Sequence, residues 1–391
     1  MSKIYVSGIG VVTPIGLDVS SFWSAMIAGQ SSFTALDSIY PGMKPGFMAG
    51  RIGSEHKTLL KQRAPTCTGS GVPDSSLYAV DAAIQAITDA GLLPGSPALR
   101  QALVCVGNNE AEADILDQML EGDNVGWHNN TYSSYVIAQN VAKAIGSGGP
   151  SMCFHNTCAS TNVALEFALR MLMSGAVNTA VVGGGDAFSK KVWSGFYTLN
   201  ALGESVCKPF ASDRRNITIT EGGAFLVLQR AAEIVSDPYA ELLAVASNND
   251  ATHPTNPDPN GVAACHRRAL EQAGLQASDI CGIYAHGTGT KANDLTEATI
   301  FSRDYRAAVT AIKGTVGHMM ATAGAIGAVG SCLSLRHQLM PPTNIDPHKY
   351  EFDFGLVTQP GGLSRPLKYV QNNSFGFGGN NAISIFKAIS P

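Results

Sequence analysis

The residues best suited to chemistry begin with a cysteine in the stretch Ser151–Thr161, where Cys158 lies among small and hydroxylic residues. Asn162–Met173 follows as a helix that is apolar on nearly every face, and Gly175 ends it. A cysteine at a helix start meets unpaired backbone N–H groups and the positive end of the helix dipole, which favour a thiolate and lower its pKa from the free value of about 8.5. The sequence therefore predicts a nucleophile able to attack a thioester. The alternative is a buried apolar thiol, a common state of cysteine.

Two histidines each follow a predicted strand. His286 comes at the end of the strand Gly282–Ala285, in a loop of glycines and threonines that lets a substrate approach the backbone closely. His318 ends the stretch Lys313–His318, again a strand with a glycine-bearing turn, before a helix of small residues. A single histidine is more often structural. Two histidines on matching loops, together with a helix-start cysteine, predict a nucleophile with acid/base partners.

A glycine-rich loop near the C-terminus completes this set. Asn372–Asn381 lies between the predicted strands Lys368–Val370 and Ile383–Phe386. A loop of this composition can present backbone N–H groups to a developing negative charge, which predicts an oxyanion hole. A second glycine cluster, Gly183–Gly185, follows a strand but lacks the G-x-G-x-x-G or Lys-Ser/Thr pattern of a nucleotide-binding loop.

Alternating strand and helix patterns must position these residues. A β-branched strand at Lys3–Val12 opens the chain, and residues 30–75 are rich in loops. The other predicted elements of the first half are helices at Ser21–Ala28, Ser76–Gly91 and Ser134–Ile145 and strands at Ala102–Val106 and Thr179–Val182. Such alternation predicts mixed, mostly parallel α/β sheets covered by helices, with ligands bound where strand ends and loops meet.

The second half of the sequence repeats the first. Residues 86–92 and 269–275 each end a helix with a glycine and a leucine, and each precedes a loop and a strand. A long apolar helix follows in both halves. We therefore expect two similar α/β halves that divide near Asp237–Pro238, with the cysteine in residues 1–237 and the two histidines in residues 238–391.

Composition limits the class of protein. The chain has 391 residues, 45% hydrophobic and 14% charged, which predicts a large buried core. A net charge of −4 without a basic run predicts no nucleic-acid or membrane partner. The eight cysteines include no C-x-x-C pair, which disfavours a zinc site and a disulfide framework. No apolar run approaches about 18 residues and the N-terminus leads into a strand, so we expect a soluble cytoplasmic protein without a bound metal.

Taken together, the motifs resemble the β-ketoacyl synthases, the condensing enzymes of fatty-acid and polyketide assembly. The resemblance runs the whole chain, from Val6–Gly16 through Cys158, the His286 loop and Lys313–His318 to Asn373–Asn381. It implies the thiolase fold, a duplicated five-layered αβαβα arrangement, and a dimer with its active sites near the interface. It also implies that no cofactor is bound and that acyl chains arrive on the phosphopantetheine arm of an acyl carrier protein.

The resemblance implies a role for each motif residue. Cys158 takes the acyl group as a thioester, and the backbone N–H groups of Cys158 and Phe377 form the oxyanion hole. His286 and His318 bind the malonyl thioester and assist its loss of CO₂ as neutral donors, because a general base would quench the enolate. The remaining implied residues are Lys313 and Glu297, which orient the histidines, Phe196 and Phe377 as gates, and Thr288 and Thr290 at the substrate.

The same residues separate the chain from related classes. Thiolases have a second cysteine at the position of His318, and synthases that start chains from coenzyme A primers have asparagine there. A Cys-His-His set therefore predicts decarboxylative elongation. Chain-length factors, the inactive partners of polyketide ketosynthases, resemble this sequence elsewhere but lack the cysteine. A non-condensing, chain-length-factor-like subunit is the alternative function, and Cys158 argues against it.

Two departures from the family pattern leave the pathway open. The segment 209–224 loses two acids and two glycines, which predicts an altered pocket or partner surface. Asn293 before Asp294 resembles polyketide and polyene ketosynthases, so both fatty-acid and type II polyketide or polyene synthesis are retained as readings.

The expected partners follow from the same resemblance. An acyl carrier protein is typically acidic, so its docking needs a local basic patch, for which Lys57, Lys61 and Arg63 are the candidates. The subunit partner is either a second copy of this chain or a chain-length-factor-like subunit.

Overall fold

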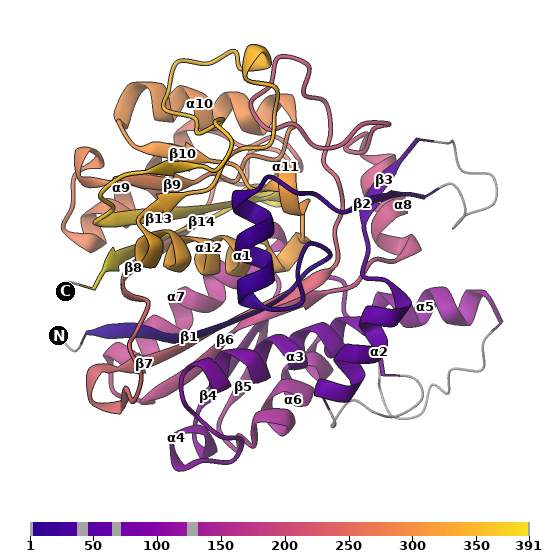
Figure 1. Cartoon of the computed structure of the whole chain (residues 1–391), viewed down its shortest axis with the longest axis vertical. Helices are drawn as coiled ribbons and strands as arrows, with labels where there is room; N and C mark the ends of the chain where they lie inside the picture. The colour runs from indigo at the N-terminus through magenta and orange to yellow at the C-terminus, as the bar shows by residue number, and fades with distance from the viewer. Residues whose placement is uncertain (1–2, 37–45, 65–71, 123–131, 390–391) are drawn as a thin grey trace.

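Ten strands are joined edge to edge in the computed structural model, which describes residues 3–36, 46–64, 72–122 and 132–389. Their order is β10-β9-β13-β14-β8-β1-β7-β6-β4-β5 (Figure 1). The first half of the chain supplies β1 Ile4–Val12, β4 Leu103–Gly107, β5 Ser151–Phe154, β6 Thr179–Asp186 and β7 Gly222–Arg230. The second half supplies β8 Ala240–Asn249, β9 Gly282–Tyr284, β10 Ala308–Thr310, β13 Tyr369–Gly376 and β14 Asn380–Ala388.

The two halves of this sheet have the same pairing pattern. β4 is parallel to β5 and β6, and β7 is antiparallel to both β6 and β1. Likewise, β9 is parallel to β10 and β13, and β14 is antiparallel to both β13 and β8. The halves meet where β1 and β8 pair through two residues each. The predicted duplication is confirmed, and a boundary near Asp237 stays a prediction.

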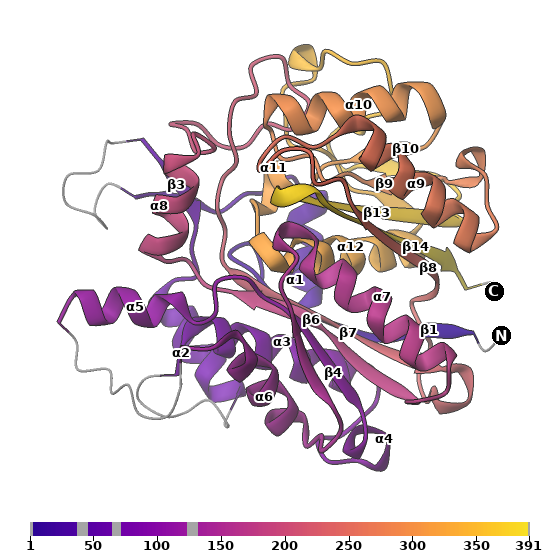
Figure 2. The ribbon, with the colours of Figure 1, turned by 180° about the vertical axis from the view of Figure 1, so that it is seen from behind.

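Helices separate and cover the two halves of the sheet. α7 (Ser160–Met173) and α12 (Ala323–His337) lie between them (Figure 1). α3 (Asp74–Asp89) and α6 (Ser134–Ile145) cover the outer face of the first half, and α9 (Pro259–Ala273) and α10 (Lys291–Asp304) cover that of the second, as the reverse view also shows (Figure 2). This order of helix, sheet, helix, sheet and helix confirms the predicted five-layered αβαβα thiolase fold.

The central helix α12 contains few large residues because it is buried and neighbouring strands approach it closely. Its first thirteen residues are all buried, as a helix apolar on every face requires. Glycines on α12 let the neighbouring strands approach closely. A Cβ on Gly327 would lie 2.1 Å from Oδ1 of Asn372 in β13, and one on Gly330 would lie 2.5 Å from the ring of Tyr284 in β9.

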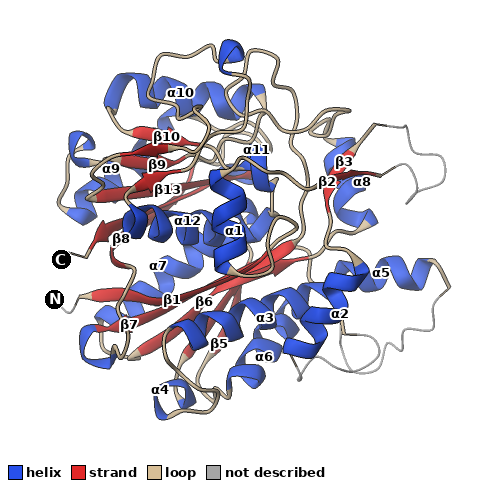
Figure 3. Cartoon of the chain, in the orientation of Figure 1, coloured by secondary structure: helices blue, strands red, loops and turns tan. Residues whose placement is uncertain are grey.

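Shorter elements complete the chain (Figure 3). The helices and 3-10 turns are α1 Val19–Ile27, α2 Ser54–Arg63, α4 Pro97–Arg100, α5 Ala113–Leu120, η2 Thr157–Ala159, α8 Lys190–Thr198, η3 Ala231–Glu233, η4 Ala277–Asp279, α11 Lys313–Val316, η5 Met320–Thr322, η6 Pro347–Lys349 and η7 Phe377–Gly379. The short strands are β2 Phe33–Ala35, β3 Met48–Gly50, β11 Leu339–Met340 and β12 Leu363–Ser364.

Three expectations about local structure are corrected. The sheet is mixed but not mostly parallel, because β7 and β14 each run antiparallel to both of their neighbours. Part of the loop-rich stretch 30–75 is α2, which buries only Leu60 and therefore has no apolar period to reveal it; residues 37–45 and 65–71 of that stretch lie outside the described residues. The stretch before His318 is the short helix α11 and not a strand.

None of the helices in the described ranges combines the length and the apolar character that crossing a membrane requires.

Candidate active site

Cys158 lies in η2, between β5 and α7, and its side chain is buried. Thr157, the residue before it, has a φ of 52°, in the left-handed region that a β-branched residue rarely adopts. Backbone in that region costs on the order of 1–3 kcal/mol and persists only where its surroundings hold it. Here the single hydroxyl proton of Thr157 is shared between the carbonyl oxygens of Asn156 and Phe377, which lie 2.8 Å and 3.0 Å from Oγ1. The turn that presents Cys158 is therefore strained and fixed.

The prediction that the Cys158 pKa is lowered is wrong. Burial raises the pKa of the Cys158 thiol to about 11, because the protein interior solvates a thiolate poorly. The charge of Lys313 and the backbone N–H groups of Cys158 and Phe377 lower this pKa, but burial outweighs them. The resting nucleophile at neutral pH is a thiol, and the groups that stabilise its anion are already in place.

The backbone N–H groups of Cys158 and Phe377 both face the sulfur. Both lower the pKa of the thiol, so they lie where negative charge develops when sulfur chemistry begins. β13 can bring Phe377 this close because residue 376 is glycine. A Cβ on Gly376 would lie 1.9 Å from Oγ1 of Thr157 and 2.9 Å from the backbone nitrogen of Cys158. The predicted loop Asn372–Asn381 is thus much shorter, since only η7 connects β13 to β14.

His286 follows β9 and is buried beside Lys313. Nζ of Lys313 donates to the carbonyl oxygen of His286 at 2.5 Å and lies 3.3 Å from Nδ1 of the same residue. Because an ammonium group is a donor only, Nδ1 of His286 accepts and the ring proton is on Nε2. Burial, Lys313 and His318 hold the pKa of His286 well below its ordinary value, so the ring is neutral.

Glu297 of α10 fixes the backbone at His286. One carboxylate oxygen accepts from the N–H of His286 at 2.8 Å, and the other accepts from the N–H of Gly287 at 2.7 Å. Two side-chain amides also donate to this carboxylate, Nδ2 of Asn293 at 3.0 Å and Nδ2 of Asn373 at 3.3 Å. Burial raises the pKa of Glu297 to about 7, although these hydrogen bonds favour the ionised form.

The backbone of residues 218–220 holds His318, so the segment that departs from the family pattern supports the site. The N–H of His318 donates to the carbonyl oxygen of Thr218 at 2.7 Å, and the N–H of Thr220 donates to the carbonyl oxygen of His318 at 3.0 Å. The N–H of Met320 donates to Nδ1 of His318 at 3.0 Å, so this ring also carries its proton on Nε2. Burial holds the pKa of His318 well below its ordinary value.

The structure brings Cys158, His286 and His318 together. The sulfur and one ring nitrogen from each histidine all lie within 4.8 Å of one another, and the two rings are 5.6 Å apart and nearly perpendicular. One thiol and two imidazoles are also ligands that zinc accepts, so geometry alone admits a metal ion. Two neutral rings with protonated Nε2 atoms can equally hold an oxyanion beside the thiol.

Two cavities meet at Cys158, and both are lined by Phe196 and Phe377. The rings of these two phenylalanines lie 5.8 Å apart. The first cavity also contains the predicted substrate residues, and its lining includes Thr288, Thr290, Asn293, Asn256 and both histidines. The second has a volume of about 340 Å³ and is lined by residues of α8 and its neighbours, among them Val192, Leu199, Met320, Lys191 and Glu110.

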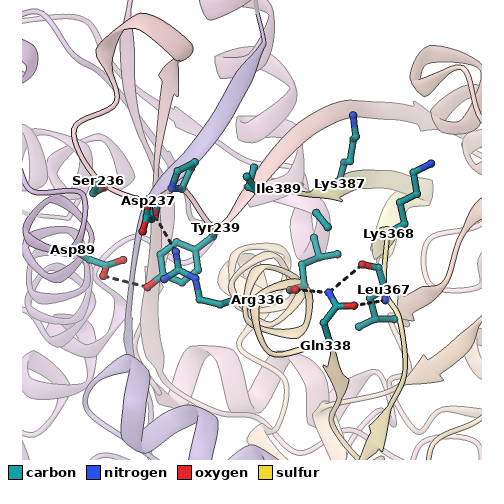
Figure 4. Close-up of a pocket in the computed structure, with 13 residues that line it drawn as sticks. Asp89, Ser236, Asp237, Tyr239, Arg336, Gln338, Leu367, Lys368, Lys387 and Ile389 are labelled. Atoms are coloured by element: carbon teal, nitrogen blue, oxygen red, sulfur yellow. Dashed lines mark hydrogen bonds between the residues drawn. The ribbon is translucent and has the colours of Figure 1, made fainter. Parts of the chain in front are cut away.

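A cavity larger than either of these two lies elsewhere, with a volume of about 960 Å³ (Figure 4). The phenol of Tyr239 donates to Asp89 at 3.1 Å, and the guanidinium of Arg336 lies 3.5 Å from the centre of the Tyr239 ring. Arg336 also donates to the carbonyl oxygen of Asp237 at 2.9 Å. These polar groups satisfy one another, and none of the predicted site residues lines the cavity, so size does not identify the active site here.

Two of the three predicted docking cations are engaged within the protein. Lys57 forms an ion pair with Asp74, and Arg63 forms one with the buried carboxylate of Asp81. Lys61 is exposed and forms no ion pair with any described residue. All three lie on α2, so only Lys61 presents a free charge to a partner.

A duplicated αβαβα fold with a cysteine at the start of one central helix and a histidine before the other defines a condensing enzyme of the thiolase-fold class. The chain belongs to the β-ketoacyl synthase family. The family model for the "Beta-ketoacyl synthase, N-terminal domain" matches residues 1–233, and that for the "Beta-ketoacyl synthase, C-terminal domain" matches residues 239–345. The predicted family is confirmed.

Known relatives match over the whole length. The chain is 28% identical to nodulation protein E of Rhizobium meliloti strain 1021, over 99% of each sequence. It is 26% identical to 3-oxoacyl-(acyl-carrier-protein) synthase 2 of Vibrio cholerae, over 98% of this chain and 99% of the relative. Among solved structures, the ishigamide ketosynthase/chain length factor is similar with a TM-score of 0.88 and 29% identity, and each chain is covered completely.

Sequence reasoning missed three contributors to the site. The strain at Thr157 has no signature in the sequence, because a β-branched residue gives no sign of a left-handed φ. Asn373 and Asn293 were noted only as parts of motifs, whereas their amides bond to Glu297. A strand predicted across Asn372–Gly376 could have indicated the role of Asn373, because alternate residues of a strand face the same side.

Proposed function

We propose that the chain is an acyltransferase that joins an acyl group on Cys158 to malonyl-acyl carrier protein by decarboxylative Claisen condensation. The observation that carries this proposal is the meeting of the Cys158 sulfur with a nitrogen of His286 and of His318 within 4.8 Å. The membership of the β-ketoacyl synthase family supports it.

Acyl transfer comes first. The sulfur of Cys158 attacks the carbonyl carbon of an acyl thioester, and the bond to the phosphopantetheine sulfur breaks. The cysteine loses its proton and the departing phosphopantetheine thiolate gains one, so the exchange is neutral overall. Because the Cys158 pKa is about 11, deprotonation accompanies attack, and the N–H groups of Cys158 and Phe377 hold the oxyanion.

Decarboxylation and condensation follow. The bond between the malonyl carboxylate and its methylene carbon breaks, CO₂ leaves, and the electron pair forms an enolate at the remaining thioester. Nε2–H of His286 and of His318 donate to the enolate oxygen, and neither neutral ring has a free base to quench the carbanion. The enolate carbon attacks the Cys158 thioester, the sulfur leaves as a thiolate that regains a proton, and the product is two carbons longer.

In this scheme the two cavities at Cys158 receive the two substrates. We assign the cavity with Thr288 and Thr290 to the phosphopantetheine arm, and the 340 Å³ cavity behind Phe196 and Phe377 to the acyl chain. No cofactor is needed in this scheme. In this scheme the chain works as a dimer, either with a second copy or with a chain-length-factor-like subunit. Both fatty-acid synthesis and polyketide or polyene synthesis are compatible with the relatives found.

The test is a single-turnover assay with acyl carrier proteins that bear chains of different lengths. The enzyme should transfer the chain to itself and, after addition of malonyl-carrier, release CO₂ and a β-keto product. A protein that acts only as a chain-length-factor-like subunit would release neither product alone. Failure with every chain length, also in the presence of a ketosynthase partner, would reject the proposal.

A further inference from the structure

A chain of buried polar side chains connects Glu297 to the far side of the second half. Gln371 and Asn373 are two residues apart on β13, so their side chains lie on the same face of the strand, toward α9 and α10. Asn372 between them points the other way, where its amide donates to the carbonyl oxygen of Gly324 in α12 at 2.9 Å. The Gln371 and Asn373 side chains are both buried.

The first link sets the direction of the Asn373 amide. Nδ2 of Asn373 donates to Oε1 of Glu297 at 3.3 Å, while its Oδ1 accepts from Nε2 of Gln371 at 2.8 Å. If the Asn373 amide turned over, its oxygen would face the carboxylate and its NH₂ would face the NH₂ of Gln371. Both contacts would become repulsive, so Gln371 holds Asn373 as a donor to Glu297.

The second link sets the direction of Gln371. Its Nε2 also lies 3.1 Å from Nδ1 of His266 in α9, and its Oε1 lies 3.3 Å from the phenol oxygen of Tyr305. The same phenol lies 2.8 Å from Nδ1 of His266. Because Nε2 of Gln371 already donates to Asn373, its second N–H is directed at Nδ1 of His266, which accepts. The single proton of the Tyr305 phenol then goes to Nδ1, and the proton of His266 is on Nε2. Burial supports this assignment by lowering the pKa of His266 to about 3, which keeps the ring neutral.

The imidazole of His266 lies at the border between polar and apolar surroundings. It is near the rings of Phe301, Tyr305 and Phe375, which belong to a cluster of buried apolar residues. Its Nε2 has no hydrogen-bond partner among the described residues. A buried donor without a partner costs about 1–3 kcal/mol, and an apolar side chain of similar shape would avoid that cost. The partners of the imidazole among the described residues are thus the Gln371 amide and the Tyr305 phenol, which its Nδ1 can orient.

We propose that His266 and Gln371 are positioning residues of the active site, which act through Asn373 to hold Glu297 and the His286 loop in place. This inference rests on the proposed function. Neither residue lines either cavity at Cys158. The charged groups that act on Glu297 are Asp294 and Lys313, and its other donors are the N–H groups of His286 and Gly287 and the Asn293 amide.

The test uses His266→Phe, which removes the acceptor, and His266→Asn, which keeps an acceptor near the position of Nδ1. In His266→Phe, malonyl decarboxylation should fall about tenfold to a hundredfold, the size of effect that a misplaced catalytic group produces. Acylation of Cys158 and the melting temperature should not fall. Gln371→Met should behave like His266→Phe, and it replaces that variant if His266→Phe fails to fold.

The pH profile separates orientation from packing. The Asn373 amide favours ionised Glu297 and lowers its pKa. When the amide is free to turn away, the pKa of Glu297 should rise, and the acid limb of decarboxylation should move to higher pH in His266→Phe and Gln371→Met but not in His266→Asn. An unmoved acid limb with an unchanged rate, or an equal loss of acylation and decarboxylation, would overturn the inference. Failure of the proposed function is distinct, since the wild type itself would then neither gain an acyl group nor release CO₂.

Discussion

At Cys158, burial favours the neutral thiol, whereas nucleophilic attack requires the thiolate. Burial raises the pKa to about 11, so at pH 7 the neutral thiol predominates. The charge of Lys313 and two backbone N–H groups partly offset the effect of burial, because they stabilise negative charge at the sulfur. Negative charge is thus stabilised when it passes to the oxyanion of the acyl intermediate, while the resting thiol stays unreactive toward other electrophiles.

The reactivity of Cys158 should therefore increase with pH across the neutral range. Alkylation by iodoacetamide should accelerate about tenfold per pH unit between pH 6 and 9, because the thiolate fraction rises until the pH reaches the pKa. Mass spectrometry of the labelled peptide gives the rate, and Cys158→Ala gives the background from other thiols. A rate that levels off below pH 8 would show a lowered pKa and contradict the effect of burial.

His286 and His318 should matter more for decarboxylation than for acylation. Replacement of either by alanine removes one Nε2–H donor from the enolate and should slow malonyl decarboxylation at least about a hundredfold, a typical contribution of a positioned catalytic group. CO₂ release and the acyl mass of the enzyme measure the two steps separately. If both steps fell equally, the histidines would be acting on the cysteine as a Cys–His pair.

The proximity of the candidate site residues could be predicted from the sequence, but their protonation could not. Cys158, His286, His318 and Lys313 stand in recognisable local motifs, and the structure brings them together. The direction of the Cys158 pKa depends on how deeply the fold buries the sulfur. The tautomers of both histidines depend on Lys313 and on the N–H of Met320, contacts that only the folded chain creates.

At the scale of elements, the approach of β13 to η2 brings together the two N–H groups of the proposed oxyanion hole. Gly376 permits this approach, since any side chain there would overlap Oγ1 of Thr157. The adjoining contact between Thr157 and the carbonyl oxygen of Phe377 then holds both N–H donors.

Gly376→Ala should therefore be destabilising and inactive. The added methyl group must displace either β13 or the strained turn, at a cost of about 1–3 kcal/mol in the free energy of unfolding, and it should prevent acylation of Cys158. Gly53→Ala is the matched control, because Gly53 has no atom within 4 Å of the added Cβ and an ordinary φ of −64°. Chemical denaturation and acyl-enzyme formation measure both effects. Normal acylation in Gly376→Ala would show that the hole tolerates movement of β13.

Elements with a strong apolar period could be predicted well, and elements without one could not. Helix α6 has the predicted bounds, and α3 and α7 begin two residues earlier than expected. Helix α2 was not predicted because it buries only Leu60, and the predicted strands on either side of Asn372–Asn381 are shorter than β13 and β14 because glycine and asparagine are frequent in the hairpin. In both cases tertiary packing decides the structure that local propensity leaves open.

For the whole molecule, the proposed function requires the carrier protein to bring its phosphopantetheine arm to the cavity that we assign to it, which contains Thr288 and Thr290. The three predicted docking cations on α2 differ in what they can offer. Lys57 and Arg63 already neutralise Asp74 and Asp81, so reversing either charge would leave a carboxylate of the fold unpaired. Of these three residues, only Lys61 can have its charge reversed without leaving a carboxylate of the described residues unpaired.

Lys61→Glu should raise the apparent KM for carrier-bound substrate and weaken its dependence on salt, because a long-range attraction to an acidic carrier is lost. The kcat with a free thioester analogue should stay the same, which controls for damage to the site. Steady-state kinetics at several ionic strengths measure both. An unaltered KM across salt concentrations would show that the carrier docks away from α2.

The duplicated architecture was the part of the whole molecule that the sequence could predict, since each half repeats the same order of helix, glycine, loop and strand. The junction of the halves could not be predicted. β1 and β8 pair through only Tyr5 with Glu241 and Val6 with Ala240, and no local pattern indicates which strand edges will meet.

The claim that Cys158 carries the acyl chain is tested most directly by intact-protein mass spectrometry of the wild type and of Cys158→Ala after incubation with acyl-carrier protein. We expect the wild type to gain the mass of one acyl group per chain, and malonyl-carrier to remove it as a product two carbons longer. The alanine variant should gain no mass and should keep its circular dichroism spectrum. An acyl mass on Cys158→Ala, or condensation without acylation in the wild type, would contradict the account.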